Sequence, residues 1–201
     1  MDYQILVNKE NLLDSDYVPE NMVEINEPTG EKADPNYVNM LEKETYIAFK
    51  KMQKEALKDG LEIFVDSSYR SYDYQKNVYD RFVNEKGLEY AERYCAIPGS
   101  SEHQTGLAFD VISRRDGVLI EKSSDDDPEI NWLKKNSYKF GFILRYPKDK
   151  ENITGYNYER WHYRYVGEEV AKIMHDEGIL TLEEYLSKYV KNKGIMKVHS
   201  F

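Results

Sequence analysis

Two short segments of the chain carry side chains that have to meet at one point of the fold. The first segment contains His103 and Asp110, and the second contains Glu159 and His162. Two histidines and an aspartate are ligand types of a catalytic zinc, which takes three protein ligands and leaves its fourth position to water. Glu159 is then a spare carboxylate that can exchange a proton with this water. The pattern predicts the site of a zinc hydrolase.

The cysteine content narrows the kind of zinc site that the chain can form. A structural zinc is usually closed by four ligands rich in cysteine, and this chain has a single cysteine, Cys95. One cysteine also excludes an intramolecular disulfide, which suits a reducing compartment. We predict that Cys95 is a small buried hydrophobic residue.

The spacing within each segment determines where the candidate ligands must lie. His103 and Asp110 are seven residues apart, so an unbroken strand would place them on opposite faces. The threonine–glycine pair between them allows His103 to lie on the loop that leads into the strand. Glu159 and His162 are three residues apart, and the aromatic, β-forming residues that follow argue against a helix. We therefore expect Glu159 in the loop before that strand or at a bulge.

The strand that contains Asp110 has one strongly apolar face. Leu107, Phe109 and Val111 alternate onto that face, whereas Asp110 lies on the other face beside the small Ala108. A single histidine or aspartate is more often an ordinary core or surface residue than a ligand. The joint pattern, with small residues that clear space around the pair, favours a metal site.

Arg70 follows a predicted strand and is a candidate substrate-binding residue. Its planar guanidinium could hold a substrate carboxylate through two parallel hydrogen bonds, although a salt bridge within an acidic protein is an equal alternative. Gln75, one turn into the next helix, and Ser101, two residues before His103, could donate to the same carboxylate or to a peptide. We expect the other basic residues to be solvated, paired with local acids or structural: Arg145, Arg160, Arg164, His175 and His199.

Length and composition indicate one compact acidic domain. The chain has 201 residues, of which 40% are hydrophobic, and this is enough to close a core. The net charge is −9, and the chain lacks the basic face that binding to nucleic acid or to an anionic membrane requires. We find no export signal and no apolar run that could span a membrane. The chain is then cytoplasmic if it is full length, or belongs to the cell envelope or the extracellular space if a leader or anchor has been removed.

The order of predicted elements favours an α+β fold, with helices flanking a mostly antiparallel sheet in a single domain. Within residues 1–201 we expect an extended N-terminal arm over 1–37 and a catalytic core over 38–190. We predict that residues 113–127 form a charged loop. The apolar periodicity and the start and stop signals predict helices from 38 to Gly60, 72–86, 88–94, 128–141, 167–177 and from Thr181, and strands over 61–67, 107–112, 142–146 and 161–166.

Two motifs resemble those of the VanY/VanXY-type D-alanyl-D-alanine carboxypeptidases, a family of zinc peptidases. They are Ser101-x-His103-x-x-Gly106-x-Ala108-x-Asp110 and Glu159-x-Trp161-His162-x-Arg164-Tyr165-Val166-Gly167. The resemblance extends through residues 68–71, 96–103 and 138–154, so it covers most of 61–167. Residues 5–9 also look like the N-terminal arm of that family.

The resemblance implies a role for each candidate residue. One zinc ion would be held by His103, Asp110 and His162, with Glu159 as the catalytic base. Arg70 would act in the substrate pocket, on the transition state or on the substrate carboxylate. The same pocket would include the substrate-binding residues Gln75, Ser101 and Trp161.

The implied reaction is removal of the terminal D-Ala from peptidoglycan stem pentapeptides or their precursors. Cytoplasmic members of the VanXY kind also cleave free D-Ala-D-Ala, which leaves a role in vancomycin resistance open beside one in cell-wall recycling. Two alternatives remain: an L,D-carboxypeptidase acting on tetrapeptide stems, and a zinc-stabilised module that binds peptidoglycan or protein without catalysis. The implied fold is the α+β fold shared by D,D-peptidases and the Hedgehog signalling domain.

Overall fold

The main sheet is antiparallel, and its strands do not follow chain order. The computed structural model describes residues 2–26 and 37–191. In this part of the chain neighbouring strands run in the order β3-β4-β7-β6, and β5 pairs with β4. The α+β expectation is confirmed. The strands are β3 (Glu62–Val65), β4 (Ala108–Arg115), β5 (Val118–Ile120), β6 (Phe142–Leu144) and β7 (His162–Tyr165), beside a separate pair of β1 (Met22–Glu24) and β2 (Met40–Glu42).

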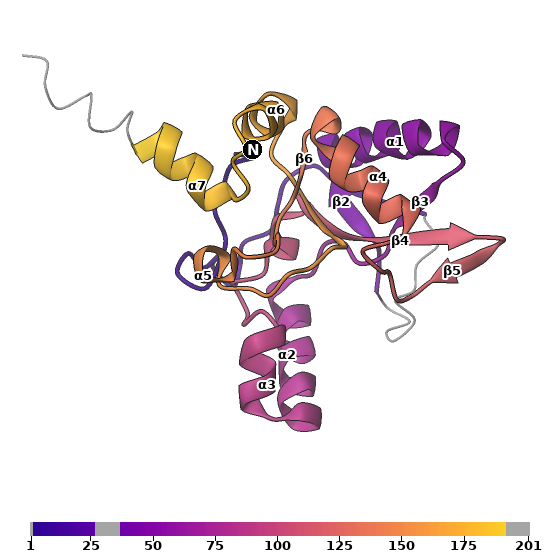
Figure 1. Cartoon of the computed structure of the whole chain (residues 1–201). Coiled ribbons are helices and arrows are strands. Elements are labelled where there is room, and N and C mark those ends of the chain that lie inside the picture. Colours follow the sequence, from indigo (N-terminus) through magenta and orange to yellow (C-terminus); the bar gives the residue numbers. More distant parts are fainter. Residues whose placement is uncertain (1, 27–36, 192–201) are drawn as a thin grey trace, which may run out of the picture.

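Helices flank the sheet on two sides. Figure 1 shows α1 (Lys43–Lys58) and α4 (Pro128–Asn136) on one side, whereas α2 (Tyr72–Lys86) and α3 (Leu88–Tyr94) project from the other side as a helical hairpin. The remaining short elements are η1 (Glu102–Thr105), η2 (Ser137–Phe140), α5 (Glu151–Thr154), α6 (Glu168–Asp176), α7 (Leu182–Leu186) and η3 (Ser187–Lys191).

Side-chain caps explain where two of the predicted helices begin. The Ser71 hydroxyl accepts a hydrogen bond from the backbone N–H of Tyr74, 3.1 Å away, at the start of α2. At the start of α7, Thr181 and Glu184 form the predicted capping box, in which each side chain bonds the backbone N–H of the other. Such a cap stabilises a helix by about 1 kcal/mol. The sequence therefore places these two helix starts correctly.

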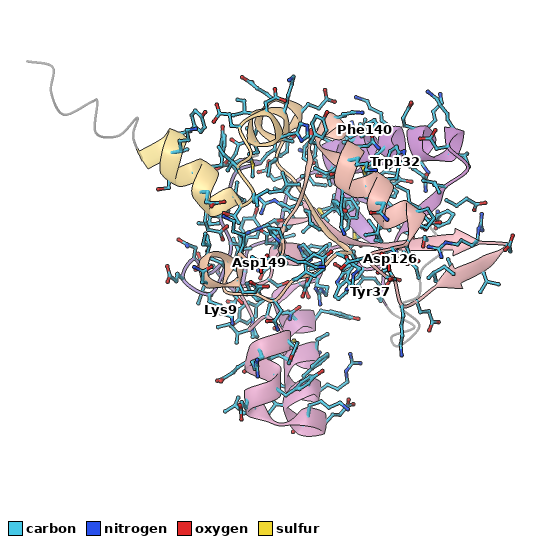
Figure 2. All side chains as sticks on the ribbon, viewed as in Figure 1. Lys9, Tyr37, Asp126, Trp132, Phe140 and Asp149 are labelled. Carbon is cyan, nitrogen blue, oxygen red and sulfur yellow. The ribbon has the colours of Figure 1, made fainter. Side chains whose placement is uncertain are left out.

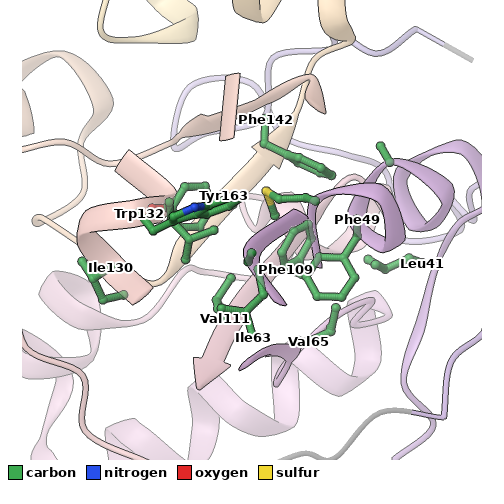
Figure 3. Close-up of a cluster of buried hydrophobic side chains, with 14 of the residues drawn as sticks. Leu41, Phe49, Ile63, Val65, Phe109, Val111, Ile130, Trp132, Phe142 and Tyr163 are labelled. Atoms are coloured by element: carbon green, nitrogen blue, oxygen red, sulfur yellow. The ribbon is translucent and has the colours of Figure 1, made fainter. Parts of the chain in front are cut away.

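The hydrophobic core lies between the sheet and the α1–α4 layer. Phe109 of β4 makes edge-to-face contacts with Phe49 of α1 and Phe142 of β6, at ring-centroid distances of 5.1 and 5.2 Å. Tyr163 of β7 faces the same cluster, as Figure 3 shows. Because side chains alternate along a strand, the neighbours of Phe109 and Tyr163 point to the opposite face. That face is therefore left for polar side chains.

A contact between α1 and α4 closes the outer side of this core. Trp132 stacks on Phe140 at a centroid distance of 6.4 Å, and Figure 2 shows the two rings together at the top of the molecule. The indole N–H of Trp132 donates to Asp59 at the end of α1, over 2.7 Å. The aromatic ring thus buries apolar area while its polar atom keeps a partner.

Two expectations about the elements were wrong. Residues 113–127 are not all loop, because β4 continues to Arg115 and returns as β5. Asp116 and Gly117 connect the two strands with φ values of 50° and 79°, which is the backbone of a two-residue hairpin turn that favours an Asp-Gly pair. Residues from Val38 do not begin a helix either, since β2 pairs with β1 before α1 starts at Lys43.

The predicted arm is only partly extended chain, and it carries strand β1. Its segment 27–36 lies outside the described residues, as does His199. Val7, near the start of the arm, is fully buried, so the arm packs against the body of the protein. None of the described helices combines the length and the apolar character needed to cross a membrane.

Candidate active site

Strand pairing brings Asp110 and His162 together on the polar face of the sheet. The two residues are direct partners in the β4–β7 ladder, so their side chains project from the same face. His162 Nδ1 lies 3.1 Å from Asp110 Oδ1. Asp110 faces away from the aromatic core, as the alternation of side chains along the strand predicted.

His103 reaches the same point from η1, which precedes β4. The turn ends at Gly106, where φ is 69°, and a Cβ atom there would lie 2.7 Å from the sulfur of Met22. The Nδ1–H of His103 donates to the Ser68 carbonyl over 2.7 Å, because a carbonyl can only accept. Nε2 therefore carries the lone pair, and it lies 3.6 Å from Asp110 Oδ1. His103 thus lies on a turn before the strand, as predicted.

The three side chains fit a metal ion. One donor atom from each of His103, Asp110 and His162 lies within 4.8 Å of the others. Tetrahedral zinc ligands about 2.1 Å from the ion lie about 3.4 Å apart, close to the 3.6 and 3.1 Å that separate Asp110 Oδ1 from the nitrogens of His103 and His162. Buried His103 Nε2 and Asp110 Oδ1 have no hydrogen-bond partner in the described part of the chain. Leaving such atoms unpaired is costly, and a bound cation would satisfy them.

The charge of the site also suits a cation. Burial lowers the pKa of His103 to about 4, which leaves the imidazole neutral and able to bind a cation. Burial opposes charge on His162 as well, but the nearby carboxylates of Asp110, at 3.1 Å, and Glu102, at 3.6 Å, raise its pKa to about 9. The carboxylates around this ring thus attract positive charge, and a metal ion would take the place of the proton.

Glu159 lies beside the three candidate ligands, in the loop before β7 as predicted. Its Oε2 is 3.7 Å from His162 Nδ1, too far for a hydrogen bond, and 27% of its side chain is exposed. Its backbone N–H donates to the Tyr146 carbonyl over 3.1 Å, which fixes the loop. Burial, with a contribution from Asp110, raises the pKa of Glu159 to about 7. The carboxylate can therefore exchange a proton near neutral pH.

A buried charge cluster behind His162 was not predicted. Glu102 Oε1 accepts hydrogen bonds from Arg145 Nε at 2.7 Å and from Arg164 Nη1 at 2.6 Å. Burial would raise the pKa of Glu102, but the two arginines hold it well below its usual range. Arg145 and Arg164 are fully buried and their shared partner is distant in sequence, so the expectation of solvated or locally paired side chains was wrong.

One signal could have indicated this burial. Arg164 is two residues after His162 on β7 and therefore shares its face. Since that face points into the protein at His162, Arg164 had to be buried with a partner. By contrast, Arg160 is part-exposed and pairs with Asp125 over 3.1 Å, and His175 stacks on Tyr138 at a centroid distance of 3.6 Å. Cys95 is buried, as predicted.

The four expected substrate-binding residues line one cavity of about 430 Å³ together with the three candidate ligands and Glu159. Arg70 Nε is buried and has no partner in the described part of the chain. Gln75 is held in place by donation from Nε2 to the Ala96 carbonyl over 2.7 Å. Ser101 is almost fully buried, and Trp161 also lines the cavity.

The cavity thus brings two histidines and an aspartate together beside a carboxylate and an arginine whose buried Nε has no partner in the described part of the chain. This arrangement is typical of peptidases of the zinc type. Residues 38–168 match the VanY family, described as D-alanyl-D-alanine carboxypeptidase, and the chain belongs to that family. The resemblance drawn from the two sequence motifs is confirmed.

Known proteins of the family resemble this chain over most of its length. YodJ of Bacillus subtilis (strain 168) is 44% identical over 92% of this chain and 67% of its own. A D-alanyl-D-alanine carboxypeptidase of Enterococcus faecalis (strain ATCC 700802 / V583) is 45% identical over 64% of this chain and 49% of its own. This chain therefore spans about half the length of the Enterococcus faecalis relative.

Two solved structures share the fold. The LdcB LD-carboxypeptidase superposes with a TM-score of 0.80 and 43% identity, covering 91% of this chain and 85% of its own. A vancomycin-resistance D,D-pentapeptidase VanY, solved in complex with Zn(II), gives a TM-score of 0.71 and 35% identity over 92% of this chain and 99% of its own. Both D,D- and L,D-specific enzymes thus share this architecture.

Proposed function

We propose that the protein is a zinc-dependent D,D-carboxypeptidase that removes the terminal D-Ala from peptidoglycan stem pentapeptides or their precursors. The observation that carries the proposal is the convergence of His103, Asp110 and His162, two of whose buried donor atoms lack a partner within the described residues, beside Glu159. Membership of the VanY family supports the substrate class. The Zn(II) complex of the VanY relative supports the metal.

His103, Asp110 and His162 would hold the zinc ion, through Nε2, Oδ1 and Nδ1 respectively. When bound in such a site, zinc supplies acidity to a water molecule, whose pKa falls from about 15.7 to about 7. The backbone hydrogen bond from His103 to Ser68 fixes the tautomer that this role requires.

Glu159 is the group that moves the proton. It would accept a proton from the attacking water and pass it to the amine nitrogen of the departing D-Ala, as the peptide C–N bond breaks. A pKa of about 7 suits both halves of this transfer, because a base that is too weak cannot accept the proton and one that is too strong cannot return it.

Arg70 would bind the terminal carboxylate of the substrate. Its guanidinium lines the cavity with a buried Nε atom that has no partner among the described residues, and a carboxylate would satisfy it. Ser101 and Gln75 line the same cavity and would orient that carboxylate, whereas Trp161 would form an apolar wall.

An L,D-carboxypeptidase acting on tetrapeptide stems is the second candidate. The observation in its favour is the likeness to LdcB, whose TM-score of 0.80 exceeds the 0.71 of the VanY structure. The metal and the role of Glu159 would be the same in both reactions, so the two candidates differ only in how the pocket accepts the residue before the cleaved bond.

Release of D-Ala by zinc-loaded protein tests both candidates in parallel. The substrates are a pentapeptide stem, a tetrapeptide stem and free D-Ala-D-Ala, with Glu159→Ala as the control. We expect release from the pentapeptide, reduced roughly a hundred- to ten-thousand-fold in the variant, while zinc content measured by metal analysis stays near one per chain. Release from the tetrapeptide alone would establish the second candidate, and no release from any of them would refute both.

A further inference from the structure

A second cavity of about 450 Å³ adjoins the candidate active site. Asp66, Asp110 and Trp161 line both cavities, so the two spaces meet at the candidate metal ligand Asp110. The residues that line only the second cavity come from β4, from β5 and the segment after it, and from the loop before β7: Val111, Ile112, Ile120, Glu121, Lys122, Ser123 and Arg160.

The sheet topology explains why a cavity forms there. One edge of β4 pairs with β3 over 111–114, and the other edge pairs with β7 over 108–110 and with β5 over 113–115. Between these two stretches the edge changes partner. The second cavity begins at the Asp110 side chain and continues along β4 to Ile112 on the same face, a distance of about 7 Å. This length accommodates about two residues of extended peptide.

The residues that line the first cavity indicate in which direction a bound peptide would run. Arg70, Gln75 and Ser101 line the first cavity and do not line the second. If a substrate carboxylate is held on their side of the site, the peptide upstream of the cleaved bond has to leave past the other side of Asp110. The second cavity shares Asp110 and none of these three residues, so it offers the peptide a path away from them.

Two cationic side chains, Arg160 and Lys122, line the second cavity. The Arg160 guanidinium is held by Asp125 at 3.1 Å and by the Ser123 carbonyl at 3.0 Å. Asp125 also binds Lys134 at 3.0 Å and Lys148 at 2.7 Å, so one carboxylate is shared by three cations. Lys122 is exposed at the rim and forms no ion pair in the described part of the chain.

The cavity also contains carboxylates, which limits the class of ligand. Asp66 lies where the two cavities meet, and Glu121 lies next to Lys122 on the rim. A surface with both signs of charge fits a peptide that carries both amino and carboxylate groups, and fits a polyanion poorly.

We propose that the second cavity binds the part of the stem peptide upstream of the cleaved bond, and that Arg160 and Lys122 recognise a free carboxylate there. This inference rests on the proposed function. In a stem peptide that carboxylate belongs to the isoglutamyl residue, which is linked through its side chain and so keeps its α-carboxylate free. Amidation of this carboxylate would then weaken binding without touching the reacting bond.

The test uses two pentapeptides that differ only at the isoglutamyl residue, one with the carboxylate and one with the carboxamide. We expect the wild-type protein to have a KM roughly two- to fivefold lower for the carboxylate, as for one part-exposed ion pair. Lys122→Gln should remove much of this preference by raising KM for the carboxylate alone, with kcat unchanged. The control Lys139→Gln changes a lysine on η2 that donates to Asn136, outside both cavities.

Equal KM values for the two peptides in the wild-type protein would overturn the inference while leaving the proposed function intact. Binding of both peptides to zinc-loaded Glu159→Ala protein, measured by calorimetry, reports the preference without turnover. If no peptide is hydrolysed but the carboxylate peptide still binds more tightly, the proposed function fails, and recognition of the free carboxylate by the second cavity is supported by itself. If neither peptide binds with a preference, the inference fails whatever the activity.

Discussion

Glu102 is the residue that connects the candidate metal site to the interior of the protein. Its Oε1 binds Arg145 and Arg164, and its Oε2 lies 3.6 Å from the Nε2 atom of His162. A metal-binding histidine commonly donates its second ring N–H to a carboxylate, and this fixes the orientation of the ring. A small shift would bring Glu102 into such a bond, so we assign it a positioning role behind His162.

Replacement of Glu102 by glutamine should therefore weaken zinc binding. Gln keeps the size of the side chain but removes the charge, and loss of such a partner commonly costs roughly ten- to a hundredfold in metal affinity. Competition with a chromogenic chelator measures the affinity, and thermal unfolding of the metal-free protein measures any separate effect on the fold. Glu151→Gln, an exposed change on α5, is the control. An unchanged zinc affinity in Glu102→Gln would refute the role.

The residues of the site were predictable to different degrees. Two histidines, an aspartate and a spare glutamate form a pattern of ligand chemistry that local spacing can place on loops and strands. Glu102 was not predictable in this way, because its partners Arg145 and Arg164 meet it only when β6, β7 and η1 come together. A charge that looks solvated in sequence can thus be buried when its partner comes from a distant segment.

Among the connections between elements, Gly141 determines the backbone conformation where η2 ends and β6 begins. Its φ is 85°, and a Cβ atom would lie 2.6 Å from the Tyr165 ring and 3.0 Å from the backbone N of Glu168. The Gly141 carbonyl also accepts from Val166 N–H over 2.9 Å. Because two of these neighbours are ring and backbone atoms, the surroundings have little freedom to move aside.

Gly141→Ala should lower the free energy of unfolding by about 2–5 kcal/mol, since backbone strain and a steric clash add. Gly178→Ala is the matched control, because φ is 66° there but no atom lies within 4 Å of the added Cβ. This control should lose only about 1 kcal/mol through strain. Urea unfolding followed by circular dichroism measures both variants, and equal losses would contradict the predicted clash.

Elements with local signals were predicted well, and those that depend on distant pairing were not. The starts of α2 and α7 follow from Ser71 and Thr181, which act on their own neighbours. The sequence predicts a helix where β2 lies, because its partner β1 is separated from it by a segment of chain with no clear periodicity. The Asp116–Gly117 turn was a local signal, and the high charge around it concealed the β5 strand.

Arg164 connects the N-terminal segment of the protein to the sheet through hydrogen bonds. Its Nη2 donates to the carbonyls of Tyr3 at 3.1 Å and Ile5 at 2.8 Å, while Arg145 binds Glu183 on α7 over 2.8 Å. Both arginines share Glu102, so the segments near the two ends of the described chain meet at one buried carboxylate behind the site.

Deletion of residues 1–7 should accordingly destabilise the whole domain. The deletion removes two acceptors of a buried guanidinium and the buried side chain of Val7, for a loss of about 2–4 kcal/mol. Gln4→Ala is the milder control, since it removes only the hydrogen bond from that side chain to the Val166 carbonyl. Denaturant unfolding compares them, and a deletion as stable as the control would show that the segment is dispensable.

The change of partner along β4 separates two tasks within one strand. Its first residues, paired with β7, carry the candidate ligand Asp110 opposite His162. The next two residues, Val111 and Ile112, line the second cavity together with Ile120 of β5. Insertions or substitutions in the β5 hairpin can therefore remodel what the protein accepts without moving the ligands. Such a division allows relatives to diverge in substrate while inheriting the same reaction centre.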